Sequence, residues 1–142
     1  MSPMAEEIPR GIRLNNPCNI RISPNEWHGK INPSTDPDFE QFDSPIDGLR
    51  AAAKLFLNYY RFDGLSTVTQ LIGRWAPSNE NDTDAYVDDV CCRVAVGPHD
   101  PIDVTQPSVL QSLLAATVVH ENGQDPYDEA TIAQAVSEAY AI

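Results

Sequence analysis

The distribution of proline divides the chain into two parts that should fold differently. Four prolines fall within one short stretch: Pro17, Pro24, Pro33 and Pro37. Because proline lacks the amide hydrogen and fixes φ, these residues should stop any helix from forming there. Apolar and polar residues alternate over residues 19–23 and, more weakly, over 39–42, a pattern typical of strands. The sequence therefore predicts irregular structure with a small hairpin over residues 10–43.

From Ser44 onward, apolar residues recur at helical spacing instead. Ser44 is a typical N-cap, Pro45 suits the first helical position, and Gly64 is a typical stop, which predicts a first long helix. Four more helices are predicted to begin near Ser66, Asn81 or Asp82, Thr105 or Gln106, and Asp128, with Gly97 and Gly123 as stops after the third and fourth helices. The predicted fold class is therefore mainly α (α+β), with about five helices and a small N-terminal β or irregular segment.

Length and composition are those of one folded domain. The chain has 142 residues, of which 42% are hydrophobic and 21% charged, values unlike those of a disordered chain. We interpret residues 1–9 as a flexible polar tail and residues 10–142 as the domain. Cys18 and the adjacent Cys91 and Cys92 form no CxxC motif, and the three histidines are scattered. We therefore expect neither a metal site nor a cofactor.

The charge of the chain restricts its partners. Nine Lys and Arg against 21 Asp and Glu give a net charge of −12 at pH 7. Nucleic-acid grooves and anionic membrane surfaces are bound by clustered basic residues, so we expect neither partner. A net charge this negative would suit an acidic inhibitor of a basic protein or a nucleic-acid mimic. The sequence shows no bilayer-spanning stretch and no secretory signal, so we expect synthesis in the cytoplasm and some other delivery route.

Three clusters of polar and aromatic residues are candidates for a functional site. The candidate catalytic residues are Glu121 and Glu80. The candidate substrate-binding residues are Asn15, Asn16 and Asn19 in the first cluster, Trp75, Asn79, Asn81, Thr83 and Tyr86 in the second, and His120 and Tyr127 in the third. Sequence motifs for phosphate-binding loops, zinc proteases, calcium loops and serine nucleophiles are absent.

Glu121 is the strongest candidate for a catalytic group. It is predicted to lie in the final turn of an apolar helix, just before Gly123. The negative end of the helix dipole and burial would both disfavour a carboxylate there. Both effects favour the protonated acid that a general acid needs near neutral pH. The alternative is that Glu121 faces solvent, or pairs with His120 or an arginine.

Structural roles compete with binding roles in the other two clusters. Trp75 and Tyr86 could stack on sugar rings, although a tryptophan at a helix end often belongs to the core. The polar residues beside them could bond sugar hydroxyls or simply cap the next helix. The asparagines of residues 15–19 could form the polar rim of a cleft or stabilise turns. The distance from Glu80 to Glu121 would decide whether a paired-carboxylate mechanism is feasible.

The same clusters carry a resemblance to a known family. The segments RGIRLNNPCNIR, RWAPSNENDTDAYV and HENGQDPY resemble, in this order, small phage and prophage proteins of the lysozyme-like superfamily, often labelled virion structural proteins. The resemblance continues through Trp27-His28-Gly29 and residues 39–51, from Arg10 to the last helix. It implies a helical lysozyme-like fold for the domain.

The resemblance also implies an activity, which is cleavage of peptidoglycan glycan strands by a muramidase or a lytic transglycosylase. The helix end at Glu121 resembles the glutamate-bearing helix end of lytic transglycosylases, where one glutamate acts as acid and then as base. The implied partners are glycan strands and other virion proteins. The implied location is the virion, or the periplasm and cell wall after delivery without a signal peptide.

Two positions depart from the family pattern, which usually has Asn and Gly where this chain has Leu14 and Cys18. Glycine permits positive φ, which cysteine adopts only at a cost, so we expect strain in this loop and altered activity if it lines the cleft. Two alternatives stay open beside the enzyme: a non-enzymatic virion component and an acidic inhibitor or mimic. A continuous acidic face would favour mimicry, whereas scattered acids around a neutral cleft would favour the enzyme.

Overall fold

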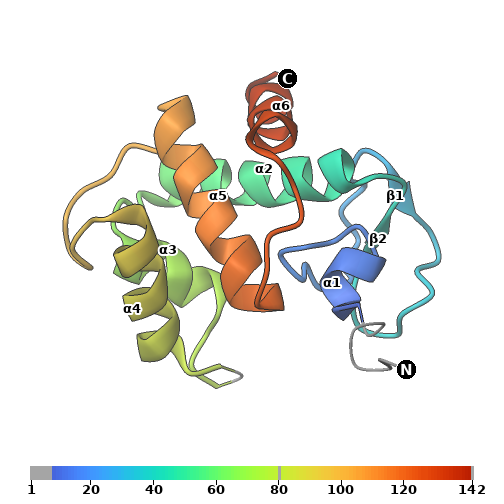
Figure 1. Ribbon diagram of the computed structural model, residues 1–142, viewed down its shortest axis with the longest axis horizontal. Helices are drawn as coiled ribbons and strands as arrows, with labels where there is room; N and C mark the ends of the chain where they lie inside the picture. Colours follow the sequence, from blue (N-terminus) through green and yellow to red (C-terminus); the bar gives the residue numbers. More distant parts are fainter. Residues whose placement is uncertain (1–7, 80, 142) are drawn as a thin grey trace.

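The computed structural model describes residues 8–79 and 81–141, which form a mainly helical structure with a small antiparallel sheet (Figure 1). This confirms the predicted fold class. The elements are α1 (Arg10–Arg13), β1 (Lys30–Ile31), β2 (Gln41–Phe42), α2 (Pro45–Asp63), α3 (Val68–Trp75), α4 (Thr83–Val94), α5 (Pro107–Asn122) and α6 (Glu129–Tyr140). Most of the predicted tail, residues 1–9, lies outside the described residues.

Helix α2 is the longest helix and has the predicted bounds. The Ser44 side chain accepts a hydrogen bond from the amide of Asp47, Pro45 occupies the first turn, and Gly64 ends the helix at a φ of 69°. One face carries apolar residues three and four positions apart, among them Leu49 and Phe56, and both are fully buried. Burial of this face against the other helices stabilises α2 through the hydrophobic effect.

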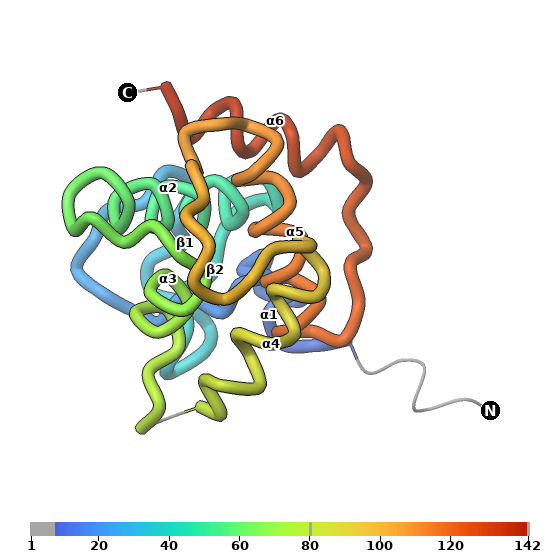
Figure 2. Tube along the Cα trace, turned by 90° about the vertical axis from the view of Figure 1, so that its left-hand side faces the viewer, coloured from blue at the N-terminus to red at the C-terminus, as the bar shows by residue number. Residues whose placement is uncertain are grey.

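The other helices pack around α2 in an order that brings distant segments together. Helix α6 packs mainly on α2, and α5 packs on α4, α6 and α2. Figure 1 shows α5 crossing in front of α2, and the turned view of Figure 2 shows α6 above them. Leu113, Leu114 and Val136 are fully buried between these helices. Within the described residues, no helix combines the length and apolar character needed to cross a bilayer.

Helix ends agree with the predictions to within two residues. Helix α3 begins after Thr67, whose side chain accepts from the Gln70 amide, rather than after Ser66. Helix α4 ends at Val94 and is followed by Ala95, which has a φ of 64°, so the predicted stop at Gly97 lies two residues too late. Asp82, Gln106 and Asp128 precede α4, α5 and α6, and Gly123 ends α5 with a φ of 73°. The misplaced stop arises because Ala95 adopts a conformation that usually favours glycine.

The N-terminal part differs from its prediction in detail. Strand β1 pairs with β2 through Lys30 opposite Phe42, whereas the predicted strand 19–23 contributes only one isolated bridge, from Arg21 to Phe39. Asn19 has a φ of 55°, which interrupts an extended run at its first residue. The one-turn helix α1 was not predicted. This helix is compatible with the nearby prolines because it ends four residues before Pro17, which is too far away to interrupt its hydrogen bonds.

Glycine allows this N-terminal part to pack closely on the helices. A Cβ atom at Gly48 of α2 would overlap the carbonyl oxygen of Asn15. A Cβ atom at Gly11 would lie 2.7 Å from Oδ1 of Asn19 and 2.9 Å from Oδ1 of Asn122. Real Cβ contacts are longer than this, so only glycine lets the loop backbone approach α2 and the end of α5.

Candidate functional site

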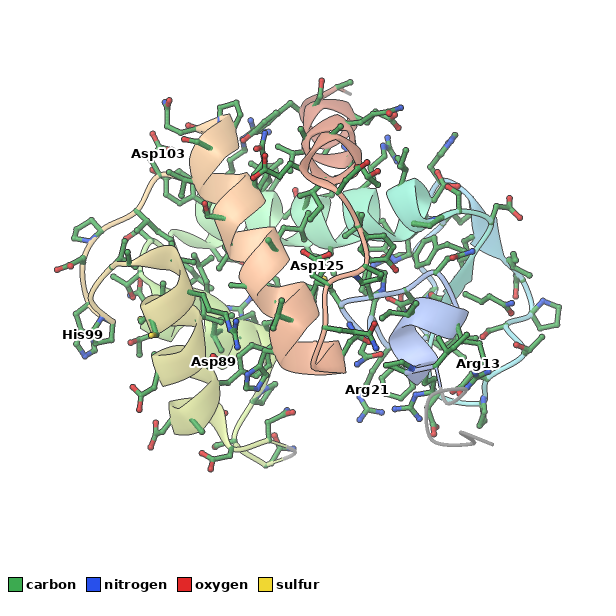
Figure 3. The ribbon with its side chains drawn as sticks, viewed as in Figure 1. Arg13, Arg21, Asp89, His99, Asp103 and Asp125 are labelled. Atoms are coloured by element: carbon green, nitrogen blue, oxygen red, sulfur yellow. The ribbon has the colours of Figure 1, made fainter. Side chains whose placement is uncertain are left out.

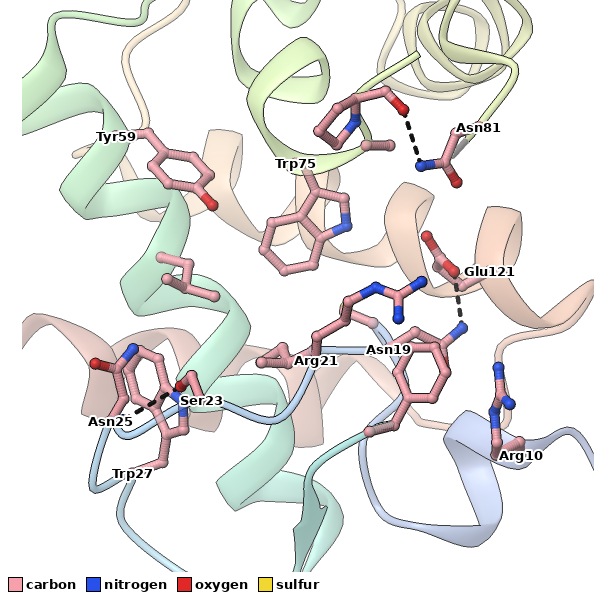
Figure 4. A pocket seen from close by; sticks show the side chains of 16 residues that line it. Arg10, Asn19, Arg21, Ser23, Asn25, Trp27, Tyr59, Trp75, Asn81 and Glu121 are labelled. Carbon is pink, nitrogen blue, oxygen red and sulfur yellow. Dashed lines mark hydrogen bonds between the residues drawn. The ribbon is translucent and has the colours of Figure 1, made fainter. Parts of the chain in front are cut away.

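A cleft of about 450 Å³ lies between the N-terminal segment, α2, the segment from α3 to α4 and the end of α5 (Figure 4). Its lining includes Arg10, Cys18, Asn19, Arg21, Trp27, Tyr59, Trp75, Asn81 and Glu121. The three clusters singled out in the sequence therefore all contribute to one cleft. They meet because α5 brings residues 120–122 against the loop that follows α1.

Glu121 lies in the last turn of α5 and lines this cleft. Its Oε1 atom accepts a 2.7 Å hydrogen bond from Nδ2 of Asn19, and its Oε2 atom accepts a 2.7 Å bond from the hydroxyl of Tyr86. The two donors come from the N-terminal loop and from α4. They fix both oxygens, and each oxygen keeps a second lone pair that can hold a proton.

Tyr86 supports Glu121 from behind and offers no open face to a ligand. Its side chain is 2% exposed. Burial, and then the negative charge of Glu121, raise the pKa of Tyr86 far above its ordinary value. The hydroxyl therefore stays protonated and acts as the donor. The sequence placed Tyr86 in a different cluster from Glu121 and suggested a stacking surface, whereas the geometry joins the two residues and gives Tyr86 a supporting role.

His120 packs against Tyr86 and links it to Asp89 of α4. Its ring stacks on the ring of Tyr86, with centroids 3.7 Å apart and planes at 30°. Nδ1 of His120 lies 2.7 Å from Oδ2 of Asp89, and Oδ1 of Asp89 accepts a 2.8 Å bond from Nε of Arg93. Figure 3 shows Asp89 on α4, the helix beside α5. The sequence-predicted His120 is thus held between two helices, outside the cleft lining.

The loop that carries Asn19 is tied to the end of α5. Nδ2 of Asn122 donates to the carbonyl of Pro17 at 2.6 Å and to that of Val118 at 2.9 Å. Asn19 adopts a φ of 55°, a conformation that asparagine accepts more readily than most residues. Oδ1 of Asn19 is buried without a hydrogen-bond partner among the described residues.

Cys18 does not carry the backbone strain that the resemblance led us to expect at this position. Positive φ outside glycine occurs, among the described residues, at Asn15, Asn19 and Ala95. The cysteine side chain is 1% exposed and packs at the base of the cleft. Burial, and then the charges of Glu121 and Asp125, raise the pKa of the Cys18 thiol well above its ordinary value. Cys18 is therefore a neutral thiol rather than a nucleophile.

Aromatic side chains line the cleft from its centre to the end opposite Glu121. Trp75 stacks on the buried Phe56 ring at a centroid distance of 4.5 Å and lines the cleft beside Tyr59. Figure 4 places Tyr59 and Trp27 at the end opposite Glu121. Flat, rigidly held rings of this kind suit the apolar faces of sugars. Tyr59 and Trp27 were not predicted as site residues, although Trp27 belongs to the segment that carries the family resemblance.

Several sequence-predicted residues have structural roles instead. Asn16 is fully buried, and its side chain bonds backbone atoms of Ile20 and Glu40. Nδ2 of Asn15 donates to the carbonyl of Phe42. These asparagines thus hold the N-terminal segment together, as the turn interpretation predicted.

The remaining predicted residues are placed as follows. Thr83 donates its hydroxyl to the carbonyl of Ala76 and so braces the start of α4. Asn79 is exposed and outside the cleft lining. Tyr127 is half-buried, and its hydroxyl has no hydrogen-bond partner in the described structure. Asn81 lines the cleft and donates to the carbonyl of Pro77. Glu80 lies outside the described residues.

The charge inside the cleft differs from that of the whole chain. The charged residues among its described lining are Arg10, Arg21 and Glu121, so the lining carries one carboxylate while the chain as a whole carries a net charge of −12. Across residues 8–79 and 81–141, no group of three or more His, Cys, Asp or Glu side chains could hold a metal ion. Glu121 is therefore the acidic group that the described lining offers for acid–base chemistry.

Comparison with known proteins places the chain among phage proteins. No family model matches the chain. Among curated proteins, "Protein P5" of Pseudoalteromonas phage PM2 is 35% identical to it over 125 residues, which cover 85% of this chain and 76% of the phage protein. The similarity therefore extends over most of both chains.

Proposed function

Because the chain belongs to the family of protein P5 of Pseudoalteromonas phage PM2, we propose that it is a phage protein that cleaves peptidoglycan glycan strands with Glu121 as its acid and base. The observation that carries the proposal is the placement of Glu121. It is the sole carboxylate among the described lining residues of a cleft that also presents Trp75 and Tyr59. Cleavage of a glycan strand needs aromatic surfaces that bind the sugar rings and a group that donates a proton to the glycosidic oxygen.

The first step of the proposed reaction uses Glu121 as a general acid. Its carboxyl group gives a proton to the glycosidic oxygen while the bond from that oxygen to the anomeric carbon breaks. The sugar is left with oxocarbenium character, and Glu121 becomes a carboxylate that stabilises the positive charge beside it. The hydrogen bonds from Asn19 and Tyr86 hold both oxygens still during this step, so little reorganisation is needed.

The second step uses the same group as a base. In a muramidase, the Glu121 carboxylate takes a proton from water, whose oxygen bonds to the anomeric carbon. In a lytic transglycosylase, it takes the proton from the C6 hydroxyl of the same muramic acid, which closes an anhydro ring. Either route can use one carboxylate as acid and then as base, and Glu121 is the carboxylate in the described lining.

The test is analysis of purified peptidoglycan by mass spectrometry after incubation with the wild type, Glu121→Gln and Glu129→Gln. Glu129 is exposed at the start of α6, so its variant controls for the lost charge. We expect products from the wild type and Glu129→Gln and none from Glu121→Gln. Reducing ends would identify a muramidase, and anhydro-muramyl ends a lytic transglycosylase. An absence of products from the wild type would contradict the proposal and favour a non-enzymatic virion component.

Membership of a phage protein family also supports a proposal about location, namely that the chain reaches the cell wall as part of the virion. Quantitative mass spectrometry of purified particles tests this. A constant number of copies in each particle is the expected result. Its absence from particles would instead require delivery after synthesis in an infected cell.

A further inference from the structure

A second cleft, of about 540 Å³, adjoins the first one. Ser23 and Trp27 line both clefts. Figure 4 shows these two residues at the end of the first cleft opposite Glu121. The second cleft therefore begins at the end away from the proposed acid, and Trp27 lies at the boundary between the two. The proposed bond cleavage uses no residue that belongs to the second cleft alone.

Apolar side chains form much of the wall of the second cleft. Besides Trp27, the apolar residues in its lining are Ile22, Pro24, Pro33 and Pro37. Nε1 of Trp27 is buried, so the part of the indole side chain that is open to the clefts consists of carbon. The polar side chains in the same lining include Ser23, Asn32, Ser34 and Asp36. An apolar wall with a few hydroxyl, amide and carboxylate groups suits a sugar, which has apolar ring faces and hydroxyl groups at its edges.

A buried ion pair holds the loop that separates the two clefts. Nζ of Lys30 donates to the carbonyls of Ser23 and Asn25, each at 2.9 Å, and lies 3.1 Å from Oε2 of Glu40. The Glu40 side chain is 1% exposed, and the same oxygen accepts a hydrogen bond from the amide of Ser23. These contacts engage all three N–H donors of Lys30, and Glu40 compensates its charge. The boundary loop is therefore fixed, and Lys30 is not open to bind an anion.

The other charged groups in the second cleft favour sugar rings over the peptide stems of peptidoglycan. Glu26 and Asp36 line it and are exposed and partly exposed, respectively. Oδ1 of Asp36 accepts hydrogen bonds from the amides of Asp38 and Phe39, and these bonds, first that of Asp38, lower the pKa of Asp36. This carboxylate therefore stays ionised near neutral pH. Two carboxylates repel the carboxyl groups of a peptide stem, whereas they can accept hydrogen bonds from sugar hydroxyls.

We propose that the second cleft binds the continuation of the glycan strand that is cut at Glu121, with Trp27 as the surface on which the strand passes from one cleft to the other. This inference rests on the proposed function and deepens it, because it specifies a substrate long enough to fill both clefts. A saccharide that fills only the first cleft lacks the contacts of the second and binds more weakly. The protein should therefore cut within long strands in preference to shortening small fragments.

The experiment measures binding by isothermal titration calorimetry in the Glu121→Gln background, where no cleavage interferes. The ligands are a tetrasaccharide and an octasaccharide from peptidoglycan without peptides, and the same octasaccharide with peptide stems. Trp27→Ala removes the shared surface. Ile22→Ser is a second, independent variant, because Ile22 is 46% exposed and lines the second cleft alone. Ile8→Ser is the matched control, since Ile8 is 58% exposed and lines neither cleft.

We expect the octasaccharide to bind about tenfold more tightly than the tetrasaccharide. Trp27→Ala should remove most of this gain. Ile22→Ser should weaken octasaccharide binding about threefold and leave tetrasaccharide binding unchanged, which also shows that the variant folds. Ile8→Ser should change neither affinity. Thermal unfolding of each variant checks the fold separately, because Trp27 also packs against the core.

The outcomes separate this proposal from the one it rests on. Equal affinity for the two peptide-free saccharides, with no effect of Ile22→Ser on either, overturns the second cleft as a glycan site and leaves glycan cleavage standing. An effect of Ile22→Ser confined to the stem-bearing ligand also overturns it, because the cleft then holds the peptide. A failure of every saccharide to bind contradicts glycan cleavage and removes the inference with it.

Discussion

The hydroxyl of Tyr86 lies 2.7 Å from Oε2 of Glu121 and joins α4 to the end of α5 behind the cleft. With the bond from Asn19 to Oε1, it fixes a carboxyl group through two donors that are far apart in the sequence. The position of Glu121 therefore depends on how α4 and the N-terminal loop pack on α5. Under the proposed function, residues that maintain this packing should affect glycan cleavage without touching the glycan.

Tyr86→Phe should reduce glycan cleavage while leaving the fold intact. The substitution keeps the buried ring and its stacking on His120, but it removes the donor to Glu121. We expect kcat to fall about tenfold or more with little change in KM, because the lost bond positions the proposed proton donor rather than the substrate. The free energy of unfolding should fall by about 1 kcal/mol, the usual value for one hydrogen bond.

Tyr140→Phe is the matched control for this variant. The hydroxyl of Tyr140 donates to the carbonyl of Val104 at 2.9 Å, and this residue does not line the cleft. Its loss should lower stability by a similar amount and leave kcat unchanged. Equal kcat values for Tyr86→Phe and the wild type would contradict the supporting role of Tyr86.

Asn19→Gly should lower activity with little change in stability, whereas Asn15→Gly should lower stability with no change in activity. Both residues have a φ of 55°, which glycine accepts without strain, so neither change disturbs the backbone. Asn19 donates to Glu121 and leaves its own Oδ1 without a partner in the described structure, and its loss should cost activity about tenfold but little stability. Asn15 donates to the carbonyl of Phe42, and its loss should cost about 1 kcal/mol and no activity.

Thermal unfolding and glycan-release assays on both variants check this prediction. Asn19→Ala adds a third comparison, because a Cβ-bearing residue without a polar side chain is strained at positive φ. It should be less stable than Asn19→Gly by about 1 kcal/mol. If Asn19→Gly retained full activity, its hydrogen bond to Glu121 would have no part in catalysis.

The helices were predictable because their signals are local. Ser44 and Pro45 define the start of α2 by capping geometry alone, and Gly64 defines its end. Glu121 could likewise be singled out as a candidate, because the negative end of the helix dipole disfavours a carboxylate just before Gly123, and the structure places Glu121 in the cleft lining. Sequence patterns within one helix turn contain this information.

The partners of Glu121 were not predictable in their roles, because their contacts are long-range. Nothing near Tyr86 in the sequence shows that its hydroxyl meets Glu121, so a stacking role was equally reasonable. Tyr59 lines the cleft although its helical spacing did not distinguish it from core residues. The strand predicted over residues 19–23 failed for a similar reason, since the turn at Asn19 depends on the buried side chain of Asn16.

Gly48→Ala should destabilise the protein, whereas Gly73→Ala should not. A Cβ atom at residue 48 would overlap the carbonyl oxygen of Asn15, so the N-terminal loop or α2 must move. We expect a loss of about 2 kcal/mol or more, as for other overpacked positions. Gly73 lies within α3 with no atom within 4 Å of its added Cβ, and alanine there should stabilise by up to about 1 kcal/mol.

Urea unfolding of both variants measures this difference, with glycan cleavage as a second readout. Movement of the loop in Gly48→Ala should also displace Asn19, so its activity should fall along with its stability. Equal stability of the two variants would show that the loop does not rest on α2 as the structure describes.

Asp89→Asn should change how stability depends on pH at acidic values. The hydrogen bond with His120 and, to a smaller extent, that with Arg93 hold the pKa of Asp89 below its ordinary value, against the opposing effect of burial. A carboxyl group whose pKa is lower in the folded state contributes stability that is fully present above its unfolded pKa of about 3.9 and is lost as the pH falls through the folded value. The advantage of the wild type over Asp89→Asn should therefore be present at about pH 5 and shrink below about pH 4.

Asp88→Asn provides the control, because Asp88 is exposed next to Asp89 on the same helix and the bonds to His120 and Arg93 come from Asp89. Free energies of unfolding measured from about pH 6 to about pH 2.5 should show the shrinking difference for Asp89→Asn and a smaller one for Asp88→Asn. Since His120 stacks on Tyr86, the Asp89 variant should also lose activity at neutral pH, which the Asp88 variant should retain. A difference between wild type and Asp89→Asn that stayed constant over the whole range would mean that Asp89 is not held by these bonds, and the support behind Glu121 would then end at Tyr86.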